Sequence, residues 1–372
     1  MTLDIPSSGR PVMQVQPSVA RSAFGRPLLV AVALLAVSSS VRGEDVVVLA
    51  DGSRVSGSIV SLGPDGIELE GRSGIEKIGI EKVRELLLDG EPDSLTSARA
   101  VLRRDPQGAL AELAKIEAAE IQAADPRIRE EYEFLKVAAA ARAATQADGA
   151  AAAQGLATFL TRNARSHHFF AGQEILGDLY ARLGKFAEAA AAYAELDRGP
   201  PALRVRSAAR KARLLLLQGK PADAIREFEL ATKIPTEAGD AISAAQKGDA
   251  QLGIAACLAR TGKAADGIQA AREAIRKADP GDRQLLASAF ATLGECQRAA
   301  GGKEEDAVIS FLTVDLVYNT VPERHAEALY NLVELWEATK QPERARDARK
   351  TLSTTYPDSP WTKKLAAAAK PS

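Results

Sequence analysis

The feature that most constrains this fold is a Gly-Lys dipeptide that recurs between amphipathic segments in the second half of the chain. The copies are 35 to 43 residues apart, and each separates an apolar segment from one that opens with small or acidic residues. Glycine commonly ends a helix because it adopts the left-handed conformation without strain. A repeat of this length therefore predicts an array of stacked helical hairpins. The four dipeptides are Gly184-Lys185, Gly219-Lys220, Gly262-Lys263 and Gly302-Lys303.

The residues around these glycines resemble the tetratricopeptide repeat (TPR), a helical hairpin with Leu-Gly, Tyr, Gly, Ala and an aromatic residue at fixed offsets. The best copy contains Leu176-Gly177, Tyr180, Gly184, Ala189 and Tyr193. Small residues matter because paired helices approach to within about 8 to 10 Å only where Gly or Ala faces the partner. Less regular copies are marked by Leu215, Gly219, Ala224 and Phe228, by Ile254, Gly262 and Ala271, by Leu293-Gly294, Ala307 and Phe311, and by Leu332, Trp336, Ala345 and Tyr356-Pro357.

Residues 44–90 follow a different pattern, in which short Val- and Ile-rich runs alternate with turn signals such as Asp51-Gly52 and Asp65-Gly66. Alternation of apolar and polar residues indicates half-buried strands, and Asp-Gly favours tight hairpins. The segment resembles the SH3-like or Sm-like small barrels of bacterial envelope proteins. Two roles remain open for it: a cap on the exposed end of the array, or a docking module for a peptide or the cell wall. The expected strands are 46–49, 54–62, 67–70, 75–80 and 83–88.

We therefore expect a mainly α protein, an α-solenoid of TPR-like helical hairpins preceded by a small all-β, barrel-like module. The hairpins should number about seven. The expected parts are a signal peptide at 1–43, the β-module at 44–90, divergent helical hairpins at 91–163, the TPR array at 164–358, and a C-terminal capping helix and tail at 359–372.

The beginning of the chain has the layout of a secretory signal peptide. Arg21 and Arg26 precede an apolar run at 28–37, and small residues lead to Gly43. The run is far shorter than the roughly 20 residues that a membrane-spanning helix needs. We expect cleavage near Gly43 and an exported protein of the bacterial cell envelope, periplasmic or secreted. Membrane contact is expected only if the segment is kept as an anchor.

Charge and motif patterns exclude several function classes. The 48 Lys and Arg residues nearly balance the 49 Asp and Glu residues, so no overall positive field attracts nucleic acid. A phosphate-binding loop is not expected either, because no Gly-Lys copy is followed by Ser or Thr. We predict no catalytic, cofactor-binding or metal-binding residues, and a hydrolytic accessory enzyme is the weakest of the alternatives.

Histidine and cysteine are scarce. His167 and His168 are adjacent at an expected turn and His325 lies about four hairpins away, which predicts surface polar residues and no metal site. Cys257 and Cys296 occupy equivalent places in neighbouring repeats. They fit small buried core residues, and a disulfide between them remains the alternative.

The TPR resemblance implies that the first helix of each hairpin lines a concave groove. The groove is mixed in charge and turns acidic at Glu327, Glu334 and Glu337. That end could receive a basic segment or be a solvated helix face. Some TPR proteins clamp a carboxylate with Lys and Asn, but the corresponding places here hold Glu174 and Asp178. The groove positions also include Asp249 and Arg260. The candidate partner-binding residues are Glu174, Asp178, Arg182, Arg206, Arg213, Glu295, Arg298, Glu327, Tyr330, Glu334 and Glu337.

The sequence thus favours a non-catalytic exported scaffold that binds protein or peptide partners through the groove. The alternative is a cell-wall-associated subunit whose β-module binds peptidoglycan or another envelope polymer.

Overall fold

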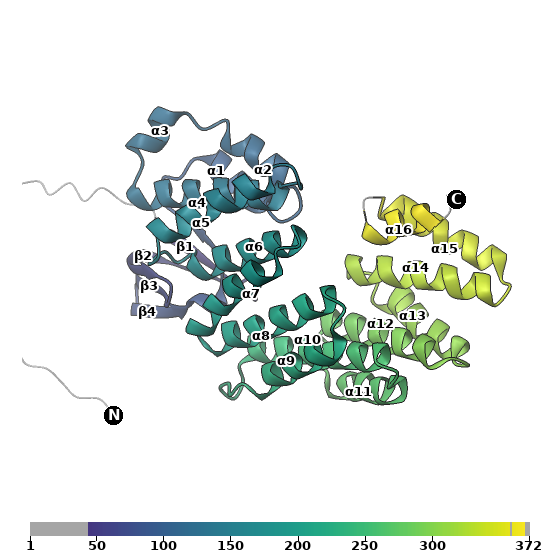
Figure 1. The fold of residues 1–372 in the computed structure, drawn as a ribbon. Helices are drawn as coiled ribbons and strands as arrows, with labels where there is room; N and C mark the ends of the chain where they lie inside the picture. The colour runs from purple at the N-terminus through teal and green to yellow at the C-terminus, as the bar shows by residue number, and fades with distance from the viewer. Residues whose placement is uncertain (1–43, 358, 369–372) are drawn as a thin grey trace, which may run out of the picture. The chain divides into compact units, whose positions relative to one another are not determined.

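The computed structural model describes residues 44–357 and 359–368, so the expected signal peptide lies outside the described residues. The described chain forms a five-stranded antiparallel sheet followed by sixteen α-helices (Figure 1). The expected fold class, a TPR-like α-solenoid behind a small β-sheet, is confirmed. Among the described helices, none combines the length and hydropathy that crossing a bilayer requires.

The sheet occupies the segment where strands were expected, in the order β4-β3-β2-β1-β5. Register irregularities in β2 near Ile59 and in β1 near Val48 interrupt the ladder. No pairing between β4 and β5 is recorded in the described region, so the sheet is established but the SH3-like or Sm-like barrel is not. The strands are β1 Asp45–Leu49, β2 Arg54–Gly63, β3 Gly66–Gly71, β4 Gly74–Gly79 and β5 Val83–Leu87, with a 3-10 turn η1 Ile80–Lys82 before β5.

The helices pair into seven hairpins within the described ranges: α1/α2, α4/α5, α6/α7, α8/α9, α10/α11, α12/α13 and α14/α15. The short helix α3, a 3-10 turn η2 (Glu195–Arg198) and the final helix α16 lie outside these pairs. The helices are α1 Asp93–Val101, α2 Pro106–Leu113, α3 Ala118–Ala123, α4 Pro126–Ala143, α5 Gly149–Arg162, α6 Phe169–Arg182, α7 Phe186–Ala194, α8 Pro201–Leu217, α9 Pro221–Lys233, α10 Ala241–Arg260, α11 Ala264–Lys277, α12 Arg283–Ala300, α13 Glu304–Val317, α14 Pro322–Ala338, α15 Pro342–Thr355 and α16 Pro360–Ala368.

The sheet and the first hairpins share one apolar core. Val47 and Ile67 of the sheet belong to the same buried cluster as Leu156 of α5. A partly buried ion pair reinforces this contact, because Asp45 at the start of β1 accepts a hydrogen bond of 2.9 Å from Arg127 of α4. The apolar face of the sheet is therefore used for packing against helices.

Glycine ends the first helix of the repeated hairpins, as the dipeptides predicted. Gly184, Gly219 and Gly262 have φ values of 73°, 72° and 82°. The N–H of the lysine that follows each glycine donates to the carbonyl five residues earlier, at 2.8 to 2.9 Å. This bond satisfies a carbonyl that the helix end would leave unpaired. In the last hairpin Lys340 adopts the same conformation, with φ 59°.

Lys340 is therefore a position where a side chain costs stability. We expect Lys340→Gly to stabilise the protein by about 0.5 to 1 kcal/mol, because glycine adopts positive φ without the Cβ clash. Thermal unfolding measures the effect. Gly184→Ala is the matched control and should destabilise the protein, and a Lys340→Gly variant less stable than the wild type would contradict this reading of the turn.

Glycine faces an aromatic ring of the partner helix in two of the hairpins. A Cβ placed on Gly177 would lie 2.4 Å from Cε1 of Tyr193, and one on Gly294 would lie 2.7 Å from Cζ of Phe311. All four residues are at positions that the TPR resemblance identified. Phe228 of α9 instead faces a glycine of the next hairpin, because a Cβ on Gly253 of α10 would lie 2.5 Å from Cζ of Phe228. Glycine thus sets helix spacing within and between hairpins.

We expect Gly177→Ala to destabilise the protein by about 1 to 3 kcal/mol, because the added methyl group overlaps the Tyr193 ring. Gly155→Ala in α5 is the control, since a Cβ there meets nothing within 4 Å and alanine favours a helix. Thermal unfolding of both variants should move the midpoint in opposite directions. Equal shifts of the two thermal midpoints would show that helix propensity, and not the contact with Tyr193, determines the effect of Gly177→Ala.

The two cysteines are buried and free. Burial raises the pKa of the Cys257 thiol to about 11 and that of the Cys296 thiol to about 12. The Cys296 Sγ lies 3.5 Å from the carbonyl oxygen of Ala255. Of the two alternatives, the structure shows core residues rather than a disulfide.

Candidate functional site

First helices of successive hairpins form one continuous layer over most of the array. Helix α8 packs on α10, α10 on α12, and α12 on α14. We call the surface made by α4, α6, α8, α10, α12 and α14 the first-helix face. Between α6 and α8 the arrangement differs, because η2 and α7 make the main contacts to α8. This interruption leaves space for a pocket.

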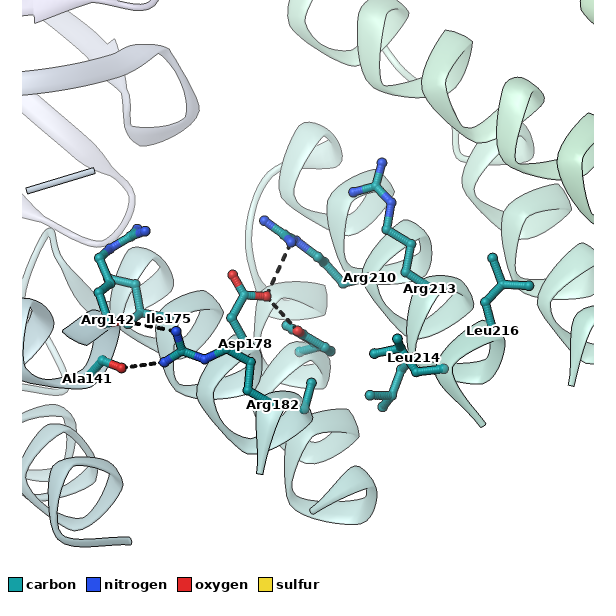
Figure 2. Close-up of a pocket in the computed structure, with 12 residues that line it drawn as sticks. Ala141, Arg142, Ile175, Asp178, Arg182, Arg210, Arg213, Leu214 and Leu216 are labelled. Carbon is teal, nitrogen blue, oxygen red and sulfur yellow. Dashed lines mark hydrogen bonds and ion pairs between the residues drawn. The ribbon is translucent and has the colours of Figure 1, made fainter. Parts of the chain in front are cut away.

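The pocket has a volume of about 800 Å³ and lies between α4, α6, α7 and α8 (Figure 2). Its walls are apolar at Ile175, Leu214 and Leu216, and Leu217 at its margin is 66% exposed. Polar groups come from all four helices. The lining residues are Ala141, Arg142, Ile175, Asp178, Ala181, Arg182, Tyr193, Arg210, Arg213, Leu214, Leu216 and Leu217.

The carboxylates beside the pocket are neutralised by arginines. Glu174 accepts hydrogen bonds from Arg206 at 3.2 Å and from Arg210 at 2.5 Å. Asp178 accepts from the Tyr193 hydroxyl at 2.7 Å and from Arg210 at 3.2 Å. Burial opposes the charge of Glu174, but Arg206 and Arg210 outweigh it and lower the pKa of the carboxyl. The predicted groove residues Glu174, Asp178 and Arg206 therefore belong to a preorganised ionic cluster that also contains Arg210.

Arg182 holds the end of the neighbouring hairpin's first helix. Its guanidinium donates to the carbonyl oxygens of Ala141 at 2.6 Å and Arg142 at 3.0 Å, at the C-terminal end of α4. A cation at a helix C-terminus is stabilised by unpaired carbonyl groups there. Arg182 is thus a structural residue of the pocket wall.

Two arginines of the pocket have no such partner. The side chains of Arg142 and Arg213 make no hydrogen bond or ion pair within the described part of the chain, and Arg142 Nε is buried without a partner. Burial and nearby Arg103 lower the pKa of Arg142, and burial and nearby Arg210 lower that of Arg213. Figure 2 shows Arg142 on one side of Asp178 and Arg213 on the other. An anion would relieve this repulsion.

A second ionic cluster continues along the first-helix face. Arg324 of α14 donates to Glu327 at 2.7 Å, and its charge acts on Asp249 of α10 and Glu295 of α12. Burial raises the pKa of Asp249 despite Arg213 and Arg324. The face thus brings together residues from successive repeats.

The acidic end expected at Glu327, Glu334 and Glu337 carries less free charge than the sequence indicated. Glu327 is buried and paired with Arg324. Glu334 accepts from Arg298 at 2.9 Å and also from Tyr330. Glu337 pairs at 2.5 Å with Arg349 of α15, the second helix of its hairpin. The alternative, a solvated helix face, is also wrong for Glu327, because tertiary packing buries this side chain.

Glu295 makes the stability of the second cluster depend on pH. Burial, and then the neighbouring carboxylate of Glu327, raise the pKa of Glu295 to about 7 from an ordinary value of 4.5. Between these two values the folded protein keeps a proton that the unfolded chain has lost, so stability falls as pH rises through this window.

We expect Glu295→Gln to remove this fall and to stabilise the protein at about pH 8 by roughly 1 to 3 kcal/mol, with little effect near pH 4. Thermal midpoints of wild type and variant, measured across the window, test this. Glu237→Gln, in an exposed loop, is the control. If Glu295→Gln left the pH dependence of the thermal midpoint unchanged, Glu295 would not be its cause.

The prediction that the histidines are surface polar residues was wrong. His167 and His325 are each 7% exposed. His325 bonds to Asp315 and Tyr356 at 2.7 and 2.8 Å. His167 and His168 lie in the turn before α6, where the sequence placed them. Both face Glu131 of α4, within 4.8 Å.

Sequence reasoning missed several residues of the face, namely Arg142, Tyr193 as a hydroxyl donor, Arg210 and Arg324. Arg210 could have been found, because it lies four residues after Arg206 and so shares its side of α8. Arg142 belongs to a hairpin without the Leu-Gly signature, and only the tertiary structure brings it to the pocket.

The fold and the pocket on the first-helix face define this protein as a TPR-type α-solenoid. No protein-family model matches the sequence, and no curated protein matches it. Among solved structures, a tetratricopeptide repeat protein from Parabacteroides merdae is similar, with a TM-score of 0.50 and 16% identity over 74% of this chain and 96% of that one.

Two further solved structures are similar at lower scores. A Rap protein in complex with Competence and Sporulation Factor has a TM-score of 0.49 and 11% identity, over 74% of this chain and 78% of that one. PilW, a type IV pilus biogenesis factor, has a TM-score of 0.42 and 15% identity, over 65% of this chain and 100% of that one.

Proposed function

We propose that this protein is a non-catalytic scaffold that binds a protein or peptide segment on its first-helix face. The observation that carries the proposal is the pocket between α4, α6, α7 and α8, where leucine and isoleucine walls lie beside two guanidinium groups that make no hydrogen bond or ion pair with any described residue. Its volume of about 800 Å³ falls in the range of about 300 to 1,000 Å³ typical of ligand sites.

The chemistry of the pocket favours binding over catalysis. The residues that line it include no Ser, Thr, Cys or His that could serve as nucleophile or general base. Its single carboxylate, Asp178, is held by Tyr193 and Arg210. Groups locked in ion pairs form a rigid rim, which lowers the entropy cost of binding.

The unpaired arginines define the partner. Arg142 and Arg213 favour a carboxylate, from an acidic side chain or a chain terminus, since guanidinium binds carboxylate with charge-assisted hydrogen bonds. The adjacent Leu214, Leu216 and Leu217 favour an apolar side chain next to it. We therefore propose an acidic and apolar peptide segment as the ligand. A basic segment at Glu327, Glu334 and Glu337 is less favoured because these carboxylates are paired.

We further propose that the sheet acts as a cap on the first hairpins. Its apolar face is buried with α4 and α5, and Asp45 is bonded to Arg127. A role in binding peptidoglycan would have to use the opposite side of the sheet. The leader-like first 43 residues support export to the cell envelope, as proposed from the sequence.

Selection from a random peptide library tests the binding proposal. Enriched peptides should combine Asp or Glu with Leu or Phe. Their affinity for Arg142→Gln/Arg213→Gln should be at least about 10-fold weaker, because two charge-assisted contacts are lost. Fluorescence polarisation measures the difference.

Arg226→Gln removes an exposed arginine of α9 and is the control for net charge. It should bind the peptides as the wild type does. Enrichment of basic peptides, or equal affinity of the double variant, would refute the proposal.

A further inference from the structure

A second site lies outside the first-helix pocket, where Glu131 of α4 meets the turn between α5 and α6. Glu131 is 1% exposed. Its Oε1 accepts a hydrogen bond of 2.9 Å from Arg99 Nε of α1. Its Oε2 lies 2.7 Å from His168 Nε2 and 3.6 Å from His167 Nε2. One carboxylate oxygen is therefore shared by two imidazoles.

Ring stacking holds the two imidazoles side by side. The His168 ring stacks on Phe134 at a centroid distance of 3.7 Å and on the other side lies 3.8 Å from the His167 ring. Ser166 supports the turn, because its hydroxyl accepts a hydrogen bond from the His168 N–H. Adjacent residues thus present the same ring nitrogen to the same oxygen.

Arg99 alone does not explain this arrangement. A structural ion pair between Arg99 and Glu131 needs only Oε1, and Glu91 already completes the pairing of Arg99 with hydrogen bonds of 2.7 and 2.9 Å. Both ring nitrogens of His167 are buried and have no hydrogen-bond partner in the described structure. A buried polar group without a partner is rare and is often explained by an ion or water.

The residue types suit a metal ion. Imidazole nitrogens and carboxylate oxygens are common metal ligands, and the cluster brings two imidazoles and one carboxylate together with their ligand atoms within 4.8 Å of one another.

We propose that Glu131, His167 and His168 bind one divalent transition-metal ion of the Zn²⁺ type. Zinc lies about 2.0 to 2.2 Å from such ligands in tetrahedral sites, which places ligand atoms about 3.3 Å apart. The separations of 2.7 and 3.6 Å bracket this value. Two nitrogens and one oxygen favour zinc over Mg²⁺ or Ca²⁺, which prefer all-oxygen sites.

The proposed ion joins three parts of the N-terminal half. It would connect α4 to the turn before α6, and Arg99 extends the link to α1 by orienting the carboxylate, as outer partners of metal ligands commonly do. A buried ion of this kind is structural, so its binding stabilises the folded chain.

Calorimetric titration of ZnCl₂ into the untagged, chelator-treated protein tests the proposal, since a polyhistidine tag would bind the same ion. We expect one Zn²⁺ per chain and a thermal midpoint raised by at least about 3 °C, an effect that Mg²⁺ does not reproduce. Absence of saturable Zn²⁺ binding by the wild-type protein would overturn the site.

His167→Gln is the decisive variant, because it removes a ligand that has no other partner. We expect Zn²⁺ affinity at least about 10-fold weaker, with circular dichroism unchanged and apo stability kept. Glu131→Gln should also weaken binding while its carbonyl still faces Arg99. His325→Gln, which changes a buried histidine elsewhere, is the control and should bind as the wild type does. Equal affinity of His167→Gln and wild type would refute the assignment.

Discussion

Close contact between Gly177 of α6 and the ring of Tyr193 of α7 is the constraint on which the central part of this structure depends. The absent Cβ lets the ring lie against the helix backbone, which fixes the spacing of the hairpin. The same contact positions the Tyr193 hydroxyl to donate to Asp178, and Asp178 in turn accepts from Arg210 of the next hairpin. One glycine thus connects helix packing to the polar edge of the candidate site.

Several carboxylates on the first-helix face are paired with arginines of the protein itself. Glu174, Glu327 and Glu334 each accept from at least one arginine. Partly buried pairs of this kind add little net stability, because desolvation offsets attraction, but they hold long side chains in fixed places. Within the pocket, Arg182 and Arg210 are also bonded to other residues of the protein, whereas the side chains of Arg142 and Arg213 make no hydrogen bond or ion pair with the described residues and keep their binding capacity.

The N-terminal half is organised by a single continuous core. The sheet, the first three hairpins and the turn that carries His167 and His168 contribute to one apolar cluster or border it. Glu131 is a fully buried carboxylate of that region, and Arg99 bonds to only one of its two oxygens. Buried polar groups in such surroundings must be satisfied, which is why the histidines turn inward and why an ion is the natural complement.

The sequence by itself determined the local elements of this protein. Gly184, Gly219 and Gly262 adopt positive φ, so their positions in the sequence predict where helices end. The spacing of small and aromatic residues predicts the helical hairpins. Only the tertiary structure decided which charges remain unpaired and that His167 is buried. The physical reason is that helix ends and periodicity depend on near neighbours in the chain, whereas burial and ion pairing depend on residues such as Arg142 and Glu131 that folding brings from distant helices.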